Sequence, residues 1–440
     1  MTAVQFKIGF ENLQTECPNP GHWRNVRLRF VARVNNPHGT LYLEPDDDVS
    51  FVPMASVGEY GGLDLTETKV LDEISDGYTF FTEGDVIVAK ITPCFENGKG
   101  ALASGLRNET AYGTTELHVL SASDGLNRRY LFYLSISQVF RSFGEGSMYG
   151  AGGQKRVPER FLKDFWVPLP PSDQQRAIAD FLDNKTAEID ALIEIKRRLL
   201  ELLAEKRAAI ITNAVTKGID PDPPLKDSGI DWFGQVPEHW EFEIPLKYFI
   251  RAFGGMTPAT GNAEYWDGDI PWVSPKDMKV IEICDTEDHV TSLAVTDTSL
   301  GIIPEGCVLF VVRGMILAHT FPVAINKVPV TLNQDMKALS LDDRLQAEFL
   351  VYFLNGISKY VLSIVDTSAH GTKALRTEQW KNLNVALPPR PEQTKIVDWI
   401  DQQTRQIDDL ETTIQEAINK LQEYRSALIT SAVTGNIKVV

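Results

Sequence analysis

The sequence predicts an α+β protein in which two globular domains are joined by two long antiparallel coiled-coil helices, related by an internal pseudo-two-fold repeat. The stretch Val167–Thr216 recurs without a gap as Val385–Thr434, at a constant offset of 218. A repeat of this length is typical of internal symmetry. Both copies carry apolar residues at spacings of three and four, which is typical of long packed helices. The segments before them alternate short Val-, Ile- and Phe-rich runs with Gly and Pro, which favours strands and turns.

Each helical copy has a recognisable start after a Leu-Pro-Pro tripeptide. In the first copy Ser172 and Gln175 have the spacing of a capping box, in which each side chain binds the backbone N–H of the other residue. In the second copy Pro391 fits the first helical position, and Glu392 places a negative charge in the first turn. We therefore expect both helices to begin just after the tripeptides.

The apolar seam of each helix follows from the same spacing. It runs through Ile178, Leu182, Ile189, Leu192, Leu199, Leu203 and Ile210 in the first copy, and through Ile396, Ile400, Ile407, Leu410, Ile414, Leu421 and Leu428 in the second. The first copy has further apolar residues beside the seam, so its apolar surface is wider than one partner helix covers. We expect the surplus to contact a globular domain or another subunit.

The domain organisation predicted from these patterns has five parts. They are a first globular domain at 1–166, a helix at 167–217, a Pro- and Gly-containing linker at 218–236, a second globular domain at 237–384 and a second helix at 385–440. The globular segments are weakly similar to each other; for example, Arg29-Phe30 matches Lys247-Tyr248. We infer that one ancestral unit was duplicated and that its globular half diverged faster than its helix.

Composition bounds the class of protein. The formal charge of −17 argues, taken alone, against a nucleic-acid partner, because Lys and Arg neutralise phosphates in such complexes. Most of that excess lies between residues 218 and 389, and an acidic protein can still present a basic face. The four cysteines are dispersed, which supports neither a disulfide framework nor a structural zinc site and favours a reducing cytoplasm. No apolar run approaches the roughly 18 residues of a membrane span.

Motifs for catalysis are missing from the sequence. It has neither the phosphate-binding loop of P-loop enzymes nor the Gly-rich turn of dinucleotide-binding domains. Asp222-Pro223-Pro224-Leu225 resembles the motif with which amino-methyltransferases hold a flipped base, but Leu225 stands at the aromatic position and no cofactor loop precedes it, so a plain linker is favoured. No histidine lies near a motif for a nucleophilic serine or cysteine. We expect a non-catalytic chain without a metal or cofactor of its own.

Two glycine-rich loops are suited to contact nucleic acid. Residues 144–156 and 367–373 keep a glycine and a lysine at matching positions (Gly153 and Gly371, Lys155 and Lys373), and such cations and amides reach phosphates or base edges. The candidate DNA-binding residues are Lys90, Gln154, Lys155, Arg156, Ser274, Lys276, Arg313, Thr372 and Lys373. The alternatives are mobile surface loops, solvated strand ends for Lys90 and Arg313, and a simple turn at Ser274.

Together these patterns resemble the specificity subunit of type I restriction-modification systems. The resemblance is carried by the Leu-Pro-Pro starts, the Ile-Asp pairs at 189–190 and 407–408, the Ala-Val-Thr endings, the strand Ile270-Pro271-Trp272-Val273 and the segment 227–240. It implies two target recognition domains, each of which reads half of a split, asymmetric double-stranded DNA sequence. It also implies two methyltransferase subunits that bind S-adenosylmethionine, and restriction (motor) subunits that join them. The first domain lacks a close copy of Asp-Ser-Gly-x-x-Trp (227–232), so its entry is expected to differ.

Three other interpretations stay open at this point. The acidic charge favours a structural bridging protein whose helices mediate assembly and whose domains bind protein. A specificity subunit of a methylation-only or other restriction-modification system would have the same sequence pattern. An adenine methyltransferase or nuclease in its own right would need a cofactor or metal motif that the sequence does not show.

Overall fold

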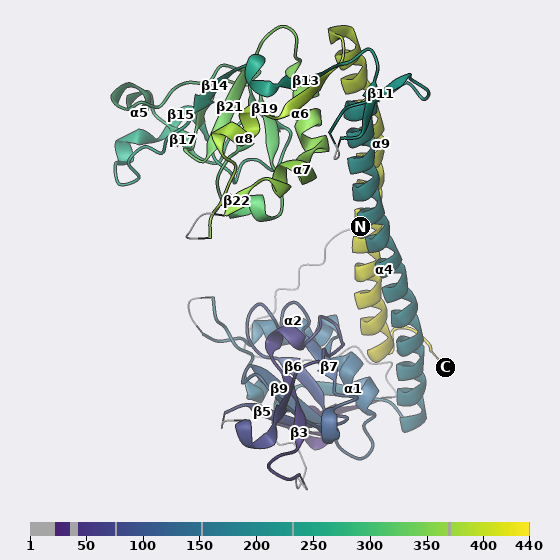
Figure 1. Cartoon of the computed structure of the whole chain (residues 1–440). Helices are drawn as coiled ribbons and strands as arrows, with labels where there is room; N and C mark the ends of the chain where they lie inside the picture. The colour runs from purple at the N-terminus through teal and green to yellow at the C-terminus, as the bar shows by residue number, and fades with distance from the viewer. Residues whose placement is uncertain are drawn as a thin grey trace. The chain divides into compact units, whose positions relative to one another are not determined.

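The protein consists of two compact units, each of which contains one globular domain and part of both long helices (Figure 1). The computed structural model describes residues 23–35, 43–74, 77–150, 153–230, 233–367 and 371–439. Unit 1 comprises Met1–Lys196 and Gln415–Val440, and unit 2 comprises Arg197–Ile414. The long helices are α4 (Ser172–Lys217) and α9 (Arg390–Val433).

The domain of unit 1 is built on two four-stranded sheets. One has the order β2 (Ala32–Val34), β9 (Leu117–Ala122), β6 (Val86–Ala89) and β7 (Gly100–Leu102), and the other β4 (Thr68–Val70), β3 (Asp48–Val52), β8 (Thr110–Gly113) and β5 (Thr79–Thr82). The helices are α1 (Arg128–Ser135), α2 (Gln138–Gly146) and α3 (Glu159–Asp164). A two-stranded sheet of β1 (Arg24–Arg27) and β10 (Trp166–Leu169) leads into α4.

The domain of unit 2 is built on a five-stranded sheet. Its order is β14 (Ile250–Gly254), β21 (Met336–Leu341), β18 (Val308–Val311), β19 (Val323–Asn326) and β16 (Glu282–Ile283). The three-stranded sheet contains β17 (His289–Val290), β15 (Trp266–Val273) and β20 (Thr331–Leu332). The helices are α5 (Ser292–Asp297), α6 (Ala347–Gly356), α7 (Ser358–Ser363) and α8 (Thr377–Lys381). The short pairs are β11 (Leu225–Asp227) with β12 (Gln235–Pro237), β13 (Glu241–Pro245) with β24 (Asn384–Leu387), and β22 (Asp366–Thr367) with β23 (Lys373–Ala374).

The two domains have the same core strand order. The strand order β2-β9-β6 of unit 1 corresponds to β14-β21-β18 of unit 2, and β1-β10 corresponds to β13-β24. The central strands β6 and β18 are buried at every position, which explains their unbroken apolar sequence. Helices α1 and α6 follow the equivalent strands β9 and β21, and helices α3 and α8 precede the equivalent strands β10 and β24. The weak similarity of the globular segments is therefore a similarity of fold.

Both long helices are inserted into the core of each domain. In unit 1, Ile178 and Leu182 of α4 and Ile429 of α9 belong to the same buried cluster as α1 and α2. In unit 2, Val215 of α4 and Ile396 of α9 belong to the core of the five-stranded sheet. Each domain is therefore fixed to a helix pair by apolar packing, which is the dominant favourable contribution to folding.

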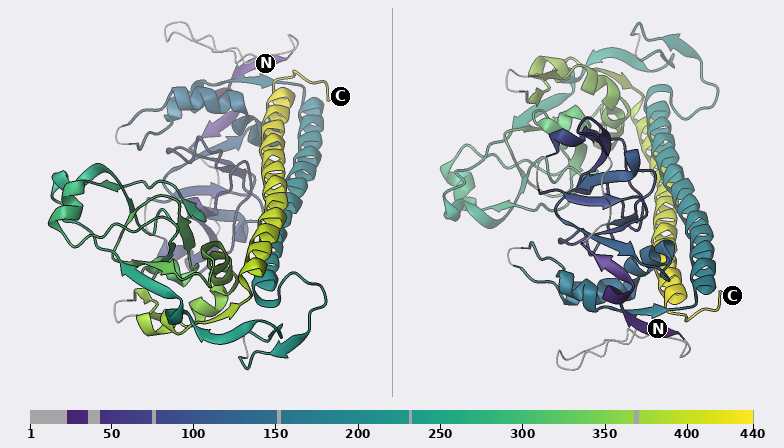
Figure 2. Two further views of the ribbon diagram at one scale, coloured as in Figure 1. Left: turned by 90° about the horizontal axis from the view of Figure 1, so that it is seen from above. Right: turned by 90° about the horizontal axis from the view of Figure 1, so that it is seen from below.

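Within each unit the helices run antiparallel (Figures 1 and 2). In unit 1, Arg425 of α9 makes an ion pair with Asp190 of α4, with Nε 2.9 Å from Oδ1. In unit 2, Arg207 of α4 makes ion pairs with Asp408 and Glu411 of α9. Because Arg207 and Arg425, and Asp190 and Asp408, are equivalent in the repeat, the two ion pairs are related by the internal symmetry. The predicted α+β architecture with paired antiparallel helices is confirmed.

The helix seam differs from the predicted one at three positions. Most predicted seam residues are buried or half-buried, but Leu192, Leu199 and Leu410 are 48%, 42% and 51% exposed. The seam passes instead through Thr186 and Ile193, both 6% exposed. Thr186 breaks the apolar pattern by which the seam was predicted. It can be buried because its hydroxyl donates to the Leu182 carbonyl at 2.8 Å. The three exposed leucines lie outside the helix contact, and their part in subunit docking stays a prediction.

The buried seam residues are Ile178, Leu182, Ile189, Leu203, Ile396, Ile400, Ile407 and Ile414. Those that are half-buried are Ile210, Leu421 and Leu428.

Candidate nucleic-acid interface

The first candidate loop is a hairpin at the end of the central strand β6. Its base is an antiparallel bridge in which the N–H of Tyr149 donates to the Arg156 carbonyl at 3.2 Å and the N–H of Arg156 to the Tyr149 carbonyl at 2.9 Å. Arg156 also forms a bridge with Ile91, next to Lys90. The structure thus brings Lys90 to the same end of the domain as Lys155 and Arg156, although Lys90 lies far from them in the sequence.

One cation of this hairpin, Arg156, forms an ion pair within the domain, and the other, Lys155, is exposed. Arg156 binds Glu116 through Nε at 3.1 and 3.0 Å and through Nη2 at 2.7 Å. This contact holds the pKa of Glu116 below its usual value and raises the pKa of Arg156. Gln154 and Lys155 are exposed at the hairpin end, so they are better placed than Arg156 to meet a phosphate.

A buried histidine supports this end of the domain. His118 is 4% exposed, and its Nε2 donates to the Val157 carbonyl at 2.9 Å. Because Nε2 carries the proton in the neutral ring, Nδ1 accepts from Asn35 Nδ2 at 3.1 Å, and Asn35 Oδ1 accepts from the Val119 N–H. Burial lowers the pKa of His118. The ring is therefore held neutral as a structural support.

The second candidate loop is the equivalent hairpin in unit 2, made by β22 and β23. Thr367 pairs with Lys373, and Lys373 Nζ donates to Thr367 Oγ1 at 2.9 Å. Arg313, at the end of β18, forms a bridge with Ala374 and an ion pair with Asp335, with Nε 2.6 Å from Oδ1. Thr372, which directly precedes Lys373 in the sequence, is half-buried. The loop residues Ala151, Gly152, Ser368, Ala369 and His370 lie outside the described residues.

Ser274 and Lys276 lie in a different setting, after strand β15. Ser274 is 5% exposed, and its N–H and Oγ both donate to Asp277 Oδ2 at 2.8 Å, which is a local turn. Lys276 pairs with Glu287 at 3.2 Å and with Asp288 at 2.8 Å. Both residues thus have local partners, and their contact with DNA stays a prediction.

Each domain is fastened to its helix by the same buried glutamine. Gln175, 1% exposed, accepts from the Asn127 N–H at 2.7 Å and donates to the carbonyls of Gly125 and Pro170 at 2.9 Å. This differs from the expected capping box with Ser172, because the side chain reaches the start of α1 rather than the first turn of its own helix. The sequence signal was the repetition of this glutamine in both copies, which capping alone does not require.

In unit 2 the contact is repeated residue for residue. Gln393, fully buried, accepts from the Gln346 N–H at 2.8 Å and donates to the carbonyls of Arg344 at 2.8 Å and Pro388 at 2.9 Å. Beside each glutamine a tryptophan donates to the preceding helix residue: Trp23 to Gln174 at 3.1 Å and Trp240 to Glu392 at 3.0 Å. We call these two sets of contacts the helix locks.

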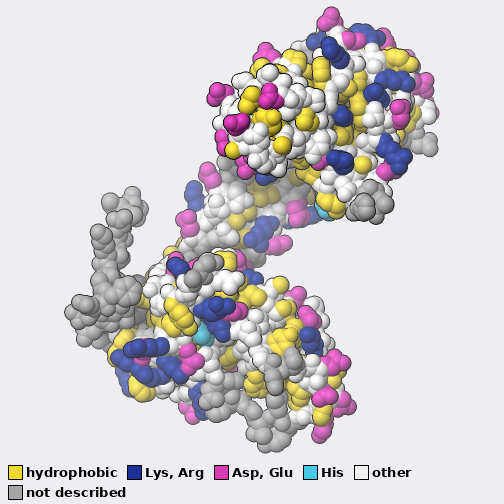
Figure 3. Space-filling view, turned by 90° about the vertical axis from the view of Figure 1, so that its left-hand side faces the viewer, with side chains coloured by type: hydrophobic (Ala, Val, Ile, Leu, Met, Phe, Trp, Pro, Cys, Tyr) yellow, Lys and Arg dark blue, Asp and Glu magenta, His cyan; other side chains and the backbone are white. Residues whose placement is uncertain are grey.

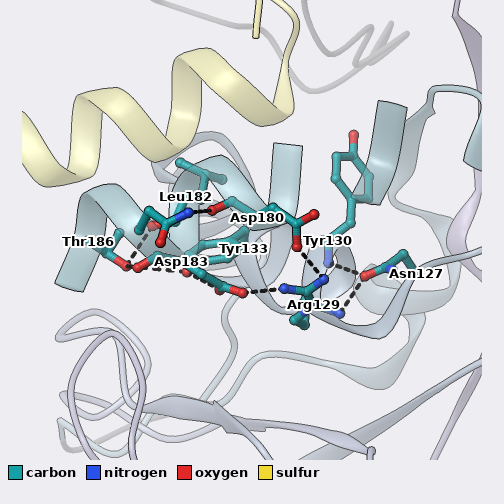
Figure 4. Close-up of polar contacts among 9 residues, drawn as sticks. Asn127, Arg129, Tyr130, Tyr133, Asp180, Leu182, Asp183 and Thr186 are labelled. Atoms are coloured by element: carbon teal, nitrogen blue, oxygen red, sulfur yellow. Dashed lines mark hydrogen bonds and ion pairs between the residues drawn. The ribbon is translucent and has the colours of Figure 1, made fainter. Parts of the chain in front are cut away.

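A tyrosine–aspartate hydrogen bond completes each helix lock. Tyr133 of α1 donates to Asp183 of α4 at 2.7 Å, and Tyr352 of α6 donates to Asp401 of α9 (Figure 4 shows the first of these). Burial raises the pKa of both tyrosines, which therefore stay protonated as donors. In unit 1, Arg129 also forms ion pairs with Asp180 at 2.6 Å and with Asp183 at 2.5 Å.

Two properties of the described residues bear on function. No three His, Cys, Asp or Glu side chains are grouped so that they could hold a metal ion in the part of the chain that the structure describes. Among the helices of that same part, none is both long and apolar enough to cross a membrane.

Comparison with known proteins assigns the chain to a family. The model of the type I restriction modification DNA specificity domain matches twice, at residues 20–202 and 237–420, and the chain belongs to this family. It is 40% identical over 161 residues to the specificity subunit of the type I restriction enzyme EcoAI from Escherichia coli, a match that covers 36% of this chain and 27% of that protein.

Solved structures show the same fold. A chain of a type I R-M system, from work on complex assembly and conformational transition, aligns over 95% of this chain and 99% of its own length, with a TM-score of 0.70 and 20% identity. The HsdS subunit from Thermoanaerobacter tengcongensis aligns over 95% of this chain and 98% of its own, with a TM-score of 0.50 and 19% identity. At these identities the likeness concerns the fold alone.

Proposed function

We propose that this chain is the non-catalytic, DNA-reading subunit of a type I restriction-modification complex and that it recognises a bipartite, asymmetric sequence in double-stranded DNA. The observation that carries the proposal is that the specificity-domain family model matches each half of the chain once. Each match includes one globular domain, one hairpin with cations at its end and one helix lock. Two globular domains that differ in sequence, each held on the helices by the same contacts, suit a DNA target made of two different half-sites.

The proposed division of the chain follows the sequence pattern. Residues 1–166 and 237–384 are the target recognition domains, 167–217 and 385–440 are the spacer helices, and 218–236 is the linker. Within the linker, β11 and β12 form a small hairpin in which Lys226 Nζ donates to the Trp240 carbonyl at 2.7 Å. DNA contact is assigned to the two hairpins, with Lys155 and Lys373 as the first residues to test.

The proposed partners are two methyltransferase subunits, which bind S-adenosylmethionine, and restriction subunits that join through them. Exposed apolar residues on α4 support a docked protein. Leu192, Ile195, Leu199 and Leu202 are 48%, 64%, 42% and 45% exposed. Spacings of three and four place them on one side of the helix. Because such a complex acts on cellular DNA, we place it in the cytoplasm.

The decisive experiment is methylome sequencing of cells that express the cognate methyltransferase with and without this chain. A bipartite adenine-methylation motif that appears only with this chain would support the proposal and reveal both half-sites. If the two proteins assemble and no new motif appears, the reading function is rejected. The bridging interpretation, which the charge of −17 favours, would then account for the assembly.

A methylation-only system is distinguished by the same cells. Adding the restriction subunit should produce cleavage of unmethylated DNA in a restricting system, and methylation alone would indicate a modification system.

A further inference from the structure

Three arginines of the first domain converge on one carboxylate. Asp164, the last residue of α3, accepts from Arg27 Nη1 at 3.2 Å, from Arg160 Nε at 3.4 Å and from Arg29 Nη2. The side chains of Arg27, Arg29 and Arg160 keep 40%, 39% and 91% of their surface exposed. A guanidinium has about five N–H donors and a carboxylate about four acceptor sites. Most donors of this arginine cluster are therefore left for another anion.

Aromatic rings hold two of the guanidinium groups in place. Arg27 lies over the Trp166 ring at 5.4 Å, and Arg29 lies over the Phe30 ring at 5.7 Å. Phe30 is itself 72% exposed. Stacking and the shared carboxylate restrict the rotamers of these side chains, which lowers the entropy lost when a ligand binds. In the space-filling view, Lys and Arg side chains gather in groups on both units (Figure 3).

The second domain shows that the fold does not need this cluster. At the equivalent junction Lys247 Nζ donates to Asn382 Oδ1 at 2.8 Å, in the place of the contact between Arg29 and Asp164. The repeat puts Pro245 at the position of Arg27 and Glu378 at that of Arg160. Lys247 still lies over the exposed ring of Tyr248, at 5.3 Å. The junction therefore forms with nearly balanced charge, whereas the first domain holds two uncompensated positive charges.

We propose that Arg27, Arg29 and Arg160 form a phosphate-binding site for the backbone of the target DNA, present in the first recognition domain and replaced in the second. The inference rests on the proposed DNA-reading function and deepens it. Planar guanidinium forks match phosphate oxygens, and contacts of this kind fix the position of the protein without reading bases. The first domain thus grips the duplex by charge more strongly than the second.

The test uses Arg27→Gln/Arg160→Gln, which removes two guanidinium groups and keeps the pairing of Arg29 with Asp164. The control is Arg176→Gln/Arg405→Gln, which makes the same change in net charge at two exposed residues of α4 and α9; Arg176 forms an ion pair with Asp173 of its own helix at 3.8 Å. Affinity for the methylome-defined duplex is measured by fluorescence anisotropy of the complex with its methyltransferase, over a series of salt concentrations.

The site predicts a specific change in salt dependence. Each lost phosphate contact should reduce the slope of log K against log salt by about 0.9, so the double variant should lose about 1.8 and the control nothing. Methylphosphonate linkages next to one half-site should weaken binding of the unmodified complex and leave the variant unaffected.

An unchanged slope, or an equal change in the control, would overturn the proposal. So would a loss of binding that size-exclusion chromatography traces to failed assembly with the methyltransferase, because the surface would then dock protein. Failure of the proposed function itself would appear separately, as the absence of sequence-specific binding by the unmodified complex.

Discussion

The helix lock allows a sharp test of how a recognition domain is held on its helix. In Gln393→Met the side chain keeps its length and helix propensity but loses every hydrogen bond. Gln393 is fully buried, so water cannot replace its amide without a rearrangement. Three groups are affected: the Pro388 carbonyl, which is buried, the Gln346 N–H, which is half-buried, and the Arg344 carbonyl, which belongs to an exposed residue.

The magnitude follows from the burial of these partners. An unsatisfied buried group costs about 1–3 kcal/mol, and an exposed carbonyl that turns to water costs little. We expect a total of about 2–3 kcal/mol for opening the contact between α6 and α9. Since about 1.4 kcal/mol is a factor of ten, amide exchange in α6 should accelerate by roughly thirty- to a hundredfold.

The assay is hydrogen–deuterium exchange of the full chain, followed on peptides from α6. Gln175→Met should have the corresponding effect on α1, and Gln415→Met, at an exposed position of α9, should have no effect on either helix. A less than threefold acceleration in both lock variants would refute the reasoning. It would mean that apolar packing alone holds each domain on its helix.

Three further predictions concern single residues. Asp190→Asn should destabilise unit 1 by about 2 kcal/mol in urea unfolding, because it removes the carboxylate from Arg425, whose side chain is 13% exposed; the equivalent Asp408→Asn should cost less than about 1 kcal/mol. Lys155→Ala should weaken DNA binding and lower the salt slope by about 0.9, and an unchanged slope would exclude a phosphate contact. Burial lowers the pKa of His118, so the stability that its neutral form contributes is present above about pH 6.5 and is lost as pH falls through the folded-state pKa; His118→Gln should reduce that acid sensitivity in urea titrations, and equal sensitivity would argue against it.

Much of the architecture could be predicted because the repeat preserves it in residue identities. The long helices and their pairing follow from the spacing of apolar residues such as Ile189 and Ile407, and the two α+β domains follow from short apolar runs separated by Gly and Pro. The register of the apolar seam was predicted less accurately than the helices themselves. Thr186 is a polar residue that is nevertheless buried, because its hydroxyl donates a hydrogen bond to the Leu182 carbonyl. A single such residue shifts the seam from Leu192 to Ile193.

The candidate interface was predictable in part. The matching glycine and lysine of the two loops pointed to hairpins that the structure places at the ends of β6 and β18. The arginine cluster could not be predicted, because Arg27 and Asp164 are 137 residues apart and the second copy lacks the charges. The helix locks left a signal in the repeated glutamines Gln175 and Gln393, and the sequence spacing assigned Gln175 to capping.

The residues of the helix locks are separate from the residues proposed to contact DNA. The residues that hold the first domain on its helix, such as Gln175 and Tyr133, lie on α4 and α1, whereas the hairpin proposed to contact DNA lies at the end of another element, β6. Under the proposed function, mutations in the hairpin that alter recognition are therefore expected to leave the contacts of Gln175 and Tyr133 intact. A change of sequence preference would then need no change in the residues that hold each domain on its helices.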